Sequence, residues 1–299
     1  MLRIREDDIF ALYRYTPTLI PPIVTVTLFF SGAIFHAFLV QRLRAKYFIP
    51  FVVGCSMEGL GYTGRIWSHY DKEGLPGYII QSLLILIAPA LFAASIYMVL
   101  GRIIGLVDGQ QHSIIPLKWL TKVFVTGDSI SFLAQALGGG IQSAGTLELL
   151  HAGEKIIVAG LFVQIFFFGV FVILAVMFHV RIYMSPTRLS CSPSIPWRRH
   201  FWALYLTSGI ILVRSIFRII EYMMGNSGWI LEHEFMLYVF DTTLMLVVVV
   251  VFLVQHPGKL FLDAKRTASE INLSTMGANP DVHGTYEELL PGCGHALAG

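Results

Sequence analysis

The sequence predicts an all-α, polytopic membrane protein folded as a bundle of seven transmembrane helices. Apolar residues make up 55% of the 299 residues and charged residues only 13%, against about 25% charged residues in soluble domains. Seven stretches stay apolar over about 20 residues, the length a helix needs to cross a bilayer core. Basic residues concentrate in alternate breaks between these stretches, as in multi-pass proteins.

The breaks between the seven stretches are short and polar. The segment 41–46 is basic, and HYDKEGLPG at 69–77 has the glycines and proline of a turn. The predicted spans are Thr18–Val40, Tyr47–Ser68, Tyr78–Leu100, Trp119–Ile141, Ile156–Phe178, Phe201–Met223 and Phe235–Val254. Residues 18–255 therefore form the predicted transmembrane domain.

The distribution of Lys and Arg predicts the orientation. Twelve of the 21 lie in the first, third and fifth connections and the C-terminal tail, and four lie in the N-terminal segment and the even-numbered connections. Because basic loops stay in the cytoplasm, residues 1–17 are predicted to be extracytoplasmic. Residues 256–299, rich in Gly, Pro, Ser and Asn, are predicted to be a disordered cytoplasmic tail. The plasma membrane is the expected location, with an endomembrane as the alternative.

The sixth predicted span carries three formal charges on one helical face. Arg214, Arg218 and Glu221 are spaced i, i+4 and i+7 in an otherwise apolar helix. A charge at the bilayer centre costs at least ~2.5 to 3.5 kcal/mol. We therefore expect partners for these charges on other helices.

Other spans supply such partners. Four intramembrane acids accompany three bases, and this near balance predicts an ion-pair network that joins the second, fourth, sixth and seventh spans. Its basic members are Arg65, Arg214 and Arg218, with Arg214 and Arg218 as the structural clamp. The acids and nearby polar groups are also candidates for a polar substrate site, because intramembrane ionisable residues commonly mark one. The alternative is that the charges only hold the helices together. The candidate substrate-binding residues are Glu58, Tyr62, Asp128, Gln135, Glu221, Tyr238 and Asp241.

The predicted spans also contain a proline and further polar residues. Pro89 predicts a kink in the third span. Either the carbonyl that the proline frees serves a site, or the kink only shapes the bundle. Tyr97 and Gln164 are expected to bond across helices. Glu234 lies at the outer entrance of the seventh span, on the same stripe as Tyr238 and Asp241.

The sequence argues against several classes of protein. No GxxxxGK[ST] motif occurs, so direct ATP binding is not expected. The three cysteines are widely scattered, and no HExxH motif occurs, so neither a metal site nor another cofactor nor an enzyme activity is expected. A net charge of +2 gives no reason to expect a nucleic-acid partner.

Short motifs follow one another in a fixed order along most of the chain. They are YRYTPT at 13–18, MEGLGYTGR at 57–65, APALFAASIY at 88–97, Gly127-Asp128 through Gln135 to GGG at 138–140, VRSIFRIIEY at 213–222 and HPG at 256–258. By these motifs and their order, the chain resembles the fungal RTA1-like family, also called the lipid-translocating exporter family. One departure is Pro21-Pro22, where the family pattern has small residues and an asparagine.

This resemblance implies seven spans with an outside N-terminus, and a role in export of, or resistance to, amphiphiles such as sphingoid long-chain bases and lysolipids. The expected partners are thus the lipid bilayer and an amphiphilic, lipid-like small molecule. A second hypothesis is a seven-helix receptor or sensor that regulates lipid homeostasis or a stress response. The helix count fits both, and a lipid-modifying enzyme is the least favoured hypothesis.

Overall fold

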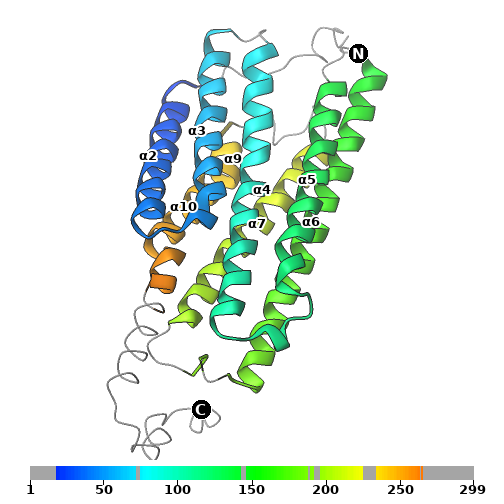
Figure 1. Cartoon of the computed structure of the whole chain (residues 1–299). Coiled ribbons are helices and arrows are strands. Elements are labelled where there is room, and N and C mark those ends of the chain that lie inside the picture. Colours follow the sequence, from blue (N-terminus) through cyan, green and yellow to red (C-terminus); the bar gives the residue numbers. More distant parts are fainter. Residues whose placement is uncertain are drawn as a thin grey trace, which may run out of the picture.

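The computed structural model describes residues 18–71, 75–142, 146–187, 189–191, 196–224, 234–262 and 264. These residues form an all-helical bundle (Figure 1), which confirms the predicted fold class. The long helices are α2 (Ile20–Arg42), α3 (Ile49–Tyr70), α4 (Leu75–Leu106), α5 (Leu117–Gln142), α6 (Leu147–Met184) and α7 (Trp197–Met223). A seventh helical segment joins α9 (Glu234–Leu237), the π-helical turn η3 (Tyr238–Thr243) and α10 (Leu244–Val254).

Five of the seven segments are long and apolar enough to cross a membrane by length and composition. The other two, α3 and α5, are 22 and 26 residues long but more polar. Glu58 and Arg65 lie within α3, and Lys118, Lys122 and Asp128 lie within α5. Glu58, Arg65 and Asp128 are buried inside the bundle, whereas Lys118 and Lys122, near the start of α5, are exposed.

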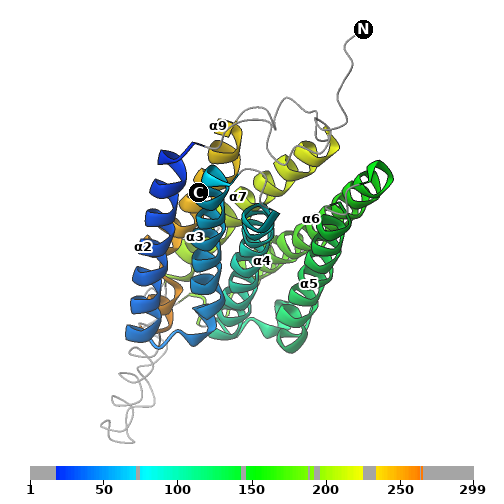
Figure 2. The same ribbon diagram turned by 90° about the horizontal axis from the view of Figure 1, so that it is seen from above.

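The helices are arranged as a closed ring. Each of α2 to α7 packs against the next along the chain, α10 packs against both α7 and α2, and α4 reaches across to α7. The view along the bundle shows this order (Figure 2). The contact of α10 with α2 closes the ring between its two chain-distant ends.

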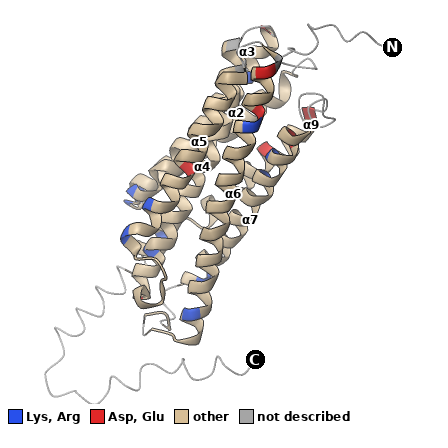
Figure 3. Ribbon diagram, turned by 90° about the vertical axis from the view of Figure 1, so that its right-hand side faces the viewer, with Lys and Arg blue, Asp and Glu red and all other residues tan. Residues whose placement is uncertain are grey.

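The surface of the bundle is the reverse of that of a soluble protein. Large apolar side chains such as Phe38, Leu137 and Trp202 are more than half exposed, whereas Glu58, Arg65 and Asp241 are at most 1% exposed. Lipid can accept the apolar surface, and the polar groups must then be satisfied inside. Figure 3 shows most described Lys and Arg residues toward the end of the bundle where α2 ends, here called the basic end. We call the other end the opposite end.

Local sequence features position the helices. Pro21 and Pro22 are accommodated in the first turn of α2, where a proline breaks no helical hydrogen bond. In α6, Thr146 caps the first turn by accepting a hydrogen bond from the Leu149 amide. The opposite ends of α5 and α6 approach closely: a Cβ atom on Gly138 would lie 2.8 Å from the Gly153 carbonyl oxygen.

The chain remains helical beyond α10. Residues 257–262 form a further helical turn in which Leu260 is fully buried, and His256 before it is also fully buried. The first residues of the predicted tail thus pack against the bundle. The rest of that tail, apart from Ala264, and the predicted extracytoplasmic segment 1–17 lie outside the described residues.

Candidate functional site

An ion cluster lies in the interior between α7 and η3. Arg214 Nε lies 2.5 Å from Asp241 Oδ1, an ion-pair contact rather than an aligned hydrogen bond. Arg218 donates to Asp241 Oδ2 at 3.3 Å and to Glu221 Oε2 at 2.9 Å. Asp241 is fully buried, and both arginines are at most 9% exposed. Each carboxylate is thus matched by a guanidinium, as burial requires.

Arg214 also depends on a proline in α4. A helical residue normally donates its amide to the carbonyl four residues earlier, and Pro89 has no amide hydrogen to give to Ile85. Instead, the Ile85 carbonyl accepts a hydrogen bond from Arg214 Nη2 at 2.9 Å. Of the two alternatives left open for Pro89, the structure shows the first: the freed carbonyl serves the ion cluster.

Glu58 lies beside this cluster but is not bonded within it. Its side chain is completely buried, and among the described residues neither of its carboxylate oxygens has a hydrogen-bond partner. It lies within electrostatic range of Asp241, Arg214 and Arg218. We call Glu58, Arg214, Arg218, Glu221 and Asp241 the central cluster. It contains three acids and two bases, and therefore one acid in excess.

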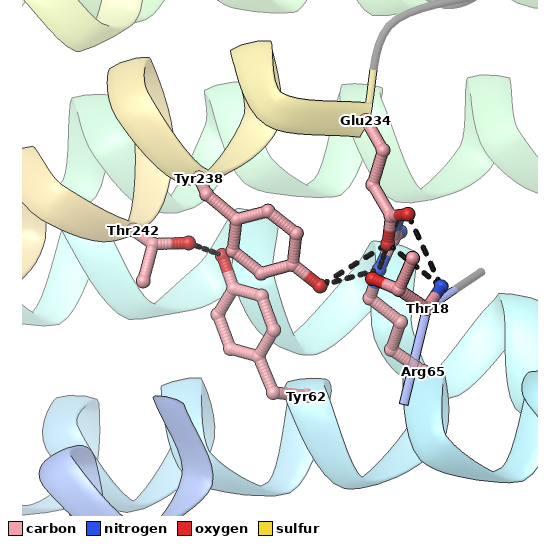
Figure 4. Close-up of polar contacts among 6 residues, drawn as sticks. All are labelled: Thr18, Tyr62, Arg65, Glu234, Tyr238 and Thr242. Carbon is pink, nitrogen blue, oxygen red and sulfur yellow. Dashed lines mark hydrogen bonds and ion pairs between the residues drawn. The ribbon is translucent and has the colours of Figure 1, made fainter. Parts of the chain in front are cut away.

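A second ion cluster closes the ring nearer the opposite end (Figure 4). Arg65 Nη2 donates to Glu234 Oε1 at 2.8 Å, and Arg65 Nε donates to the Tyr238 hydroxyl at 3.1 Å. The backbone amide of Thr18 donates to the same carboxylate, at 3.1 Å to Oε2. Glu234 therefore joins the chain just before α2 to α3 and α9.

Tyr62 connects the two clusters. Its hydroxyl forms a hydrogen bond with Thr242 in the π-helical turn, and its ring stacks with that of Tyr238, 6.2 Å away between centroids. The π-helical turn carries Tyr238, Asp241 and Thr242. Such turns are frequent at functional sites, because the extra residue redirects side chains.

Asp128 lies apart from both clusters. Tyr97 of α4 donates its hydroxyl to Asp128 Oδ2 at 2.8 Å, whereas Asp128 Oδ1 is buried without a partner among the described residues. Further along α5, Gln135 donates to Ser131 Oγ at 2.8 Å and to Gln164 Oε1 of α6 at 3.2 Å. The expected bonding of Tyr97 and Gln164 across helices is therefore present.

The structure divides the predicted network into separate parts. Arg214 and Arg218 contact Asp241 and Glu221, and Arg65 contacts Glu234. Asp128 has no arginine partner among the described residues. Of the candidate substrate-binding residues, Glu58, Tyr62, Glu221, Tyr238 and Asp241 lie in or between the two clusters. Asp128 and Gln135 lie on the α5–α6 side of the bundle.

Sequence reasoning did not assign two of the contributors. Glu234 was placed on the stripe of Tyr238 and Asp241 but not paired with Arg65, because pairing across the ring has no signal in a single sequence. Thr242 carries no charge and directly follows Asp241, so the sequence pattern indicates the acid and not the threonine. Among the described residues, no three His, Cys, Asp or Glu side chains are placed to hold a metal ion.

The apolar exterior, the helical ring and the paired charges inside define this chain as a polytopic membrane protein with a buried polar site. Residues 51–264 match the family model described as RTA1 like protein. The chain belongs to the RTA1-like family. No solved structure matches it.

Three relatives come from Saccharomyces cerevisiae. Protein RTA1 is 37% identical over 275 residues, covering 84% of this chain and 86% of the relative. Protoporphyrin uptake protein 1 is 38% identical over 288 residues, covering 82% of this chain and 92% of the relative. Sphingoid long-chain base transporter RSB1 is more distant, at 25% identity over 266 residues, covering 77% of this chain and 69% of the relative.

Proposed function

We propose that this protein moves an amphiphilic, lipid-like molecule with a cationic headgroup across a membrane, and that Glu58 receives the headgroup. The observation that carries the proposal is the fully buried Glu58 carboxyl group without a hydrogen-bond partner among the described residues. A buried carboxylate is costly unless it is paired. A cationic headgroup would supply the charge that the central cluster lacks.

The surroundings of Glu58 suit an amphiphile. Tyr62 lies one helical turn after Glu58 in α3, and its ring stacks with that of Phe29, with 6.2 Å between centroids. The side chain of Cys55 is buried on the same face of α3. Sphingoid bases carry an amine on a long alkyl chain, so they need one acid and an apolar wall. The relative named as a sphingoid long-chain base transporter supports this substrate class, and the one named for protoporphyrin uptake supports movement of hydrophobic molecules in general.

The orientation and the absence of catalysis are part of the same proposal. The basic end faces the cytoplasm, because Lys and Arg concentrate in cytoplasmic loops, and the plasma membrane is the proposed location. Substrate is moved without chemical change and without direct ATP binding. A seven-helix receptor or sensor remains the competing hypothesis, and the experiment below separates the two.

Reconstitution tests the proposal directly. The purified full chain is placed in liposomes, and movement of a fluorescent long-chain base between leaflets is measured, with a labelled lysolipid and a porphyrin as further probes. Wild-type protein should accelerate movement of the long-chain base, and Glu58→Gln should reduce that acceleration at least tenfold. The exposed acid Glu148 provides the control, because Glu148→Gln should leave the rate unchanged.

Two outcomes would overturn the proposal. If wild-type protein moves none of the probes, the receptor hypothesis is favoured. If Glu58→Gln moves the long-chain base as fast as wild type, Glu58 is not the headgroup site. Thermal unfolding and gel filtration of the variant show whether it is folded, so a loss of movement through misfolding is recognised.

A further inference from the structure

Asp128 is a second intramembrane acid whose charge the protein does not neutralise. It is 3% exposed, and among the described residues no Lys or Arg forms an ion pair with it. Its partner is the Tyr97 hydroxyl at Oδ2, and Oδ1 is buried with no hydrogen-bond partner. A solitary acid of this kind within a span is a functional-site candidate.

The two sides of Asp128 differ in polarity. Around Tyr97 lie the rings of Phe124, Phe168 and Phe171, with centroids 5.4, 6.0 and 4.4 Å from that of Tyr97. In the other direction Ser131 and Gln135 continue the same buried face of α5 toward the opposite end. Buried polar side chains therefore lie on one side of Asp128, and aromatic rings lie on the other.

The polar side forms a continuous series of hydrogen bonds. Ser131 donates to the Gly160 carbonyl at 2.5 Å, and Gln135 donates to Ser131 and to Gln164. The Gln135 Oε1 atom remains a buried acceptor without a partner among the described residues. Two unsatisfied atoms of this stripe, Asp128 Oδ1 and Gln135 Oε1, are thus both acceptors, which favours a ligand that brings positive charge or a hydrogen.

We propose that Asp128 is a proton-binding site that couples the lipid movement proposed above to a proton gradient. A proton needs one free carboxylate oxygen, which Oδ1 provides, while Tyr97 holds Oδ2. Among the described residues, no three His, Cys, Asp or Glu side chains are placed to hold a metal ion, so a proton suits Oδ1 better than a metal cation. In the step itself, a hydronium ion on one side loses an O–H bond as Oδ1 forms one. That bond at Oδ1 breaks when the proton passes to a water molecule on the other side, which becomes hydronium.

The coupling follows from the cost of burying charge. A carboxyl group enclosed without a cation is stable in its neutral form, so the closed arrangement carries the proton and an open arrangement releases it. Glu58 and Asp128 then have separate tasks, because α4 lies between their helices in the ring. Glu58 holds the substrate headgroup, and Asp128 holds the proton.

The first test uses proteoliposomes with and without a pH difference. A difference of one pH unit corresponds to 1.36 kcal/mol per proton, so wild-type protein should distribute the labelled long-chain base up to about tenfold unevenly between leaflets. Asp128→Asn should move the base but reach an even distribution. The matched control is Asp71→Asn, an exposed acid at the end of α3, which should retain the wild-type response.

A second readout does not require lipid movement. Infrared difference spectra recorded across pH detect the C=O stretch of a protonated carboxyl group, and Asp128→Asn should remove one such band. Tyr97→Phe removes the donor to Oδ2 but keeps the acid, so the band should remain and titrate at higher pH. If Asp128 binds no proton in this pH range, neither Asp128→Asn nor Tyr97→Phe would change the spectra.

The outcomes distinguish this inference from the function on which it rests. If wild-type protein moves no lipid, the proposed function fails, while the infrared band still tests proton binding. If Asp128→Asn keeps the uneven distribution, or if a sodium difference replaces the pH difference for the wild type, proton coupling at Asp128 is wrong. Loss of the band in Glu58→Gln but not in Asp128→Asn would assign the proton to the other acid.

Discussion

Asp241 and Glu58 are both fully buried carboxyl groups, yet their surroundings give them different roles. Asp241 contacts two guanidinium groups, at 2.5 Å to Arg214 and 3.3 Å to Arg218. Glu58 makes no hydrogen bond to any described residue. Removing the charge of Asp241 therefore leaves Arg214 without a carboxylate partner and leaves Arg218 with Glu221 alone, whereas removing that of Glu58 breaks no ion pair. We therefore expect substitution of Asp241 to act mainly on stability and substitution of Glu58 to act mainly on transport.

We expect Asp241→Asn to lower the free energy of unfolding by about 3 to 5 kcal/mol, the usual cost of breaking a buried ion pair from one side. Glu58→Gln should change it by less than about 1 kcal/mol while it reduces lipid movement at least tenfold. Denaturation of the reconstituted variants measures both values, with Asp71→Asn as the exposed control. Equal destabilisation by the two substitutions would mean that Glu58 has a structural partner.

At the scale of helices, Pro89 frees a backbone carbonyl of α4 that accepts a hydrogen bond from α7. The proline interrupts the hydrogen bonding of α4 within the bundle interior, and the carbonyl that it frees at Ile85 is used by Arg214 of α7. A proline inside a helix normally costs about 3 kcal/mol. Here part of that cost is offset, because a hydrogen bond from a charged donor contributes about 1.5 to 3 kcal/mol.

A double-mutant cycle tests this connection. Pro89→Ala restores an amide that competes for the Ile85 carbonyl, so in the wild-type background it should stabilise little or destabilise. In an Arg214→Met background the carbonyl has lost its donor, and the same Pro89→Ala change should stabilise the protein. We expect a coupling energy of at least about 1 kcal/mol from thermal or denaturant unfolding. Additive effects would show that Pro89 and Arg214 act independently.

The helices themselves follow closely from the sequence, but their mutual contacts do not. The spans were predictable because apolar runs of membrane length have few alternative structures. The i, i+3 pair of Arg218 and Glu221 was also predictable, since both lie on one helix. By contrast, Glu58 and Arg65 share a face of α3 but have different neighbours. Glu58 lies near Asp241 of η3, and Arg65 binds Glu234 of α9. That information lies in the ring closure, which no local pattern encodes.

For the whole molecule, the closure of the ring depends on contacts between its chain-distant ends. Glu234 binds Arg65 and the Thr18 amide, 216 residues away in sequence. Further down, His36 of α2 contacts the Val249 carbonyl of α10 through Nε2 at 3.1 Å. The first contact is partly exposed and the second is fully buried. We therefore expect the ring to open more easily near Glu234 than near His36.

Loss of the Glu234 carboxylate should loosen that end without unfolding the bundle. We expect Glu234→Ala to lower the free energy of unfolding by about 1.5 to 3 kcal/mol, because the buried Arg65 guanidinium loses the charged hydrogen bond to Glu234. Spin labels on the exposed positions Ile20 and Val239 report the separation of α2 from η3, and their distance distribution should broaden in Glu234→Ala. Asp71→Ala, at the same end but exposed, should leave the distribution narrow. If Glu234→Ala also leaves it narrow, the buried contact between His36 and Val249 is sufficient to hold α2 against the seventh helical segment, and an opening for lipid must form elsewhere in the ring.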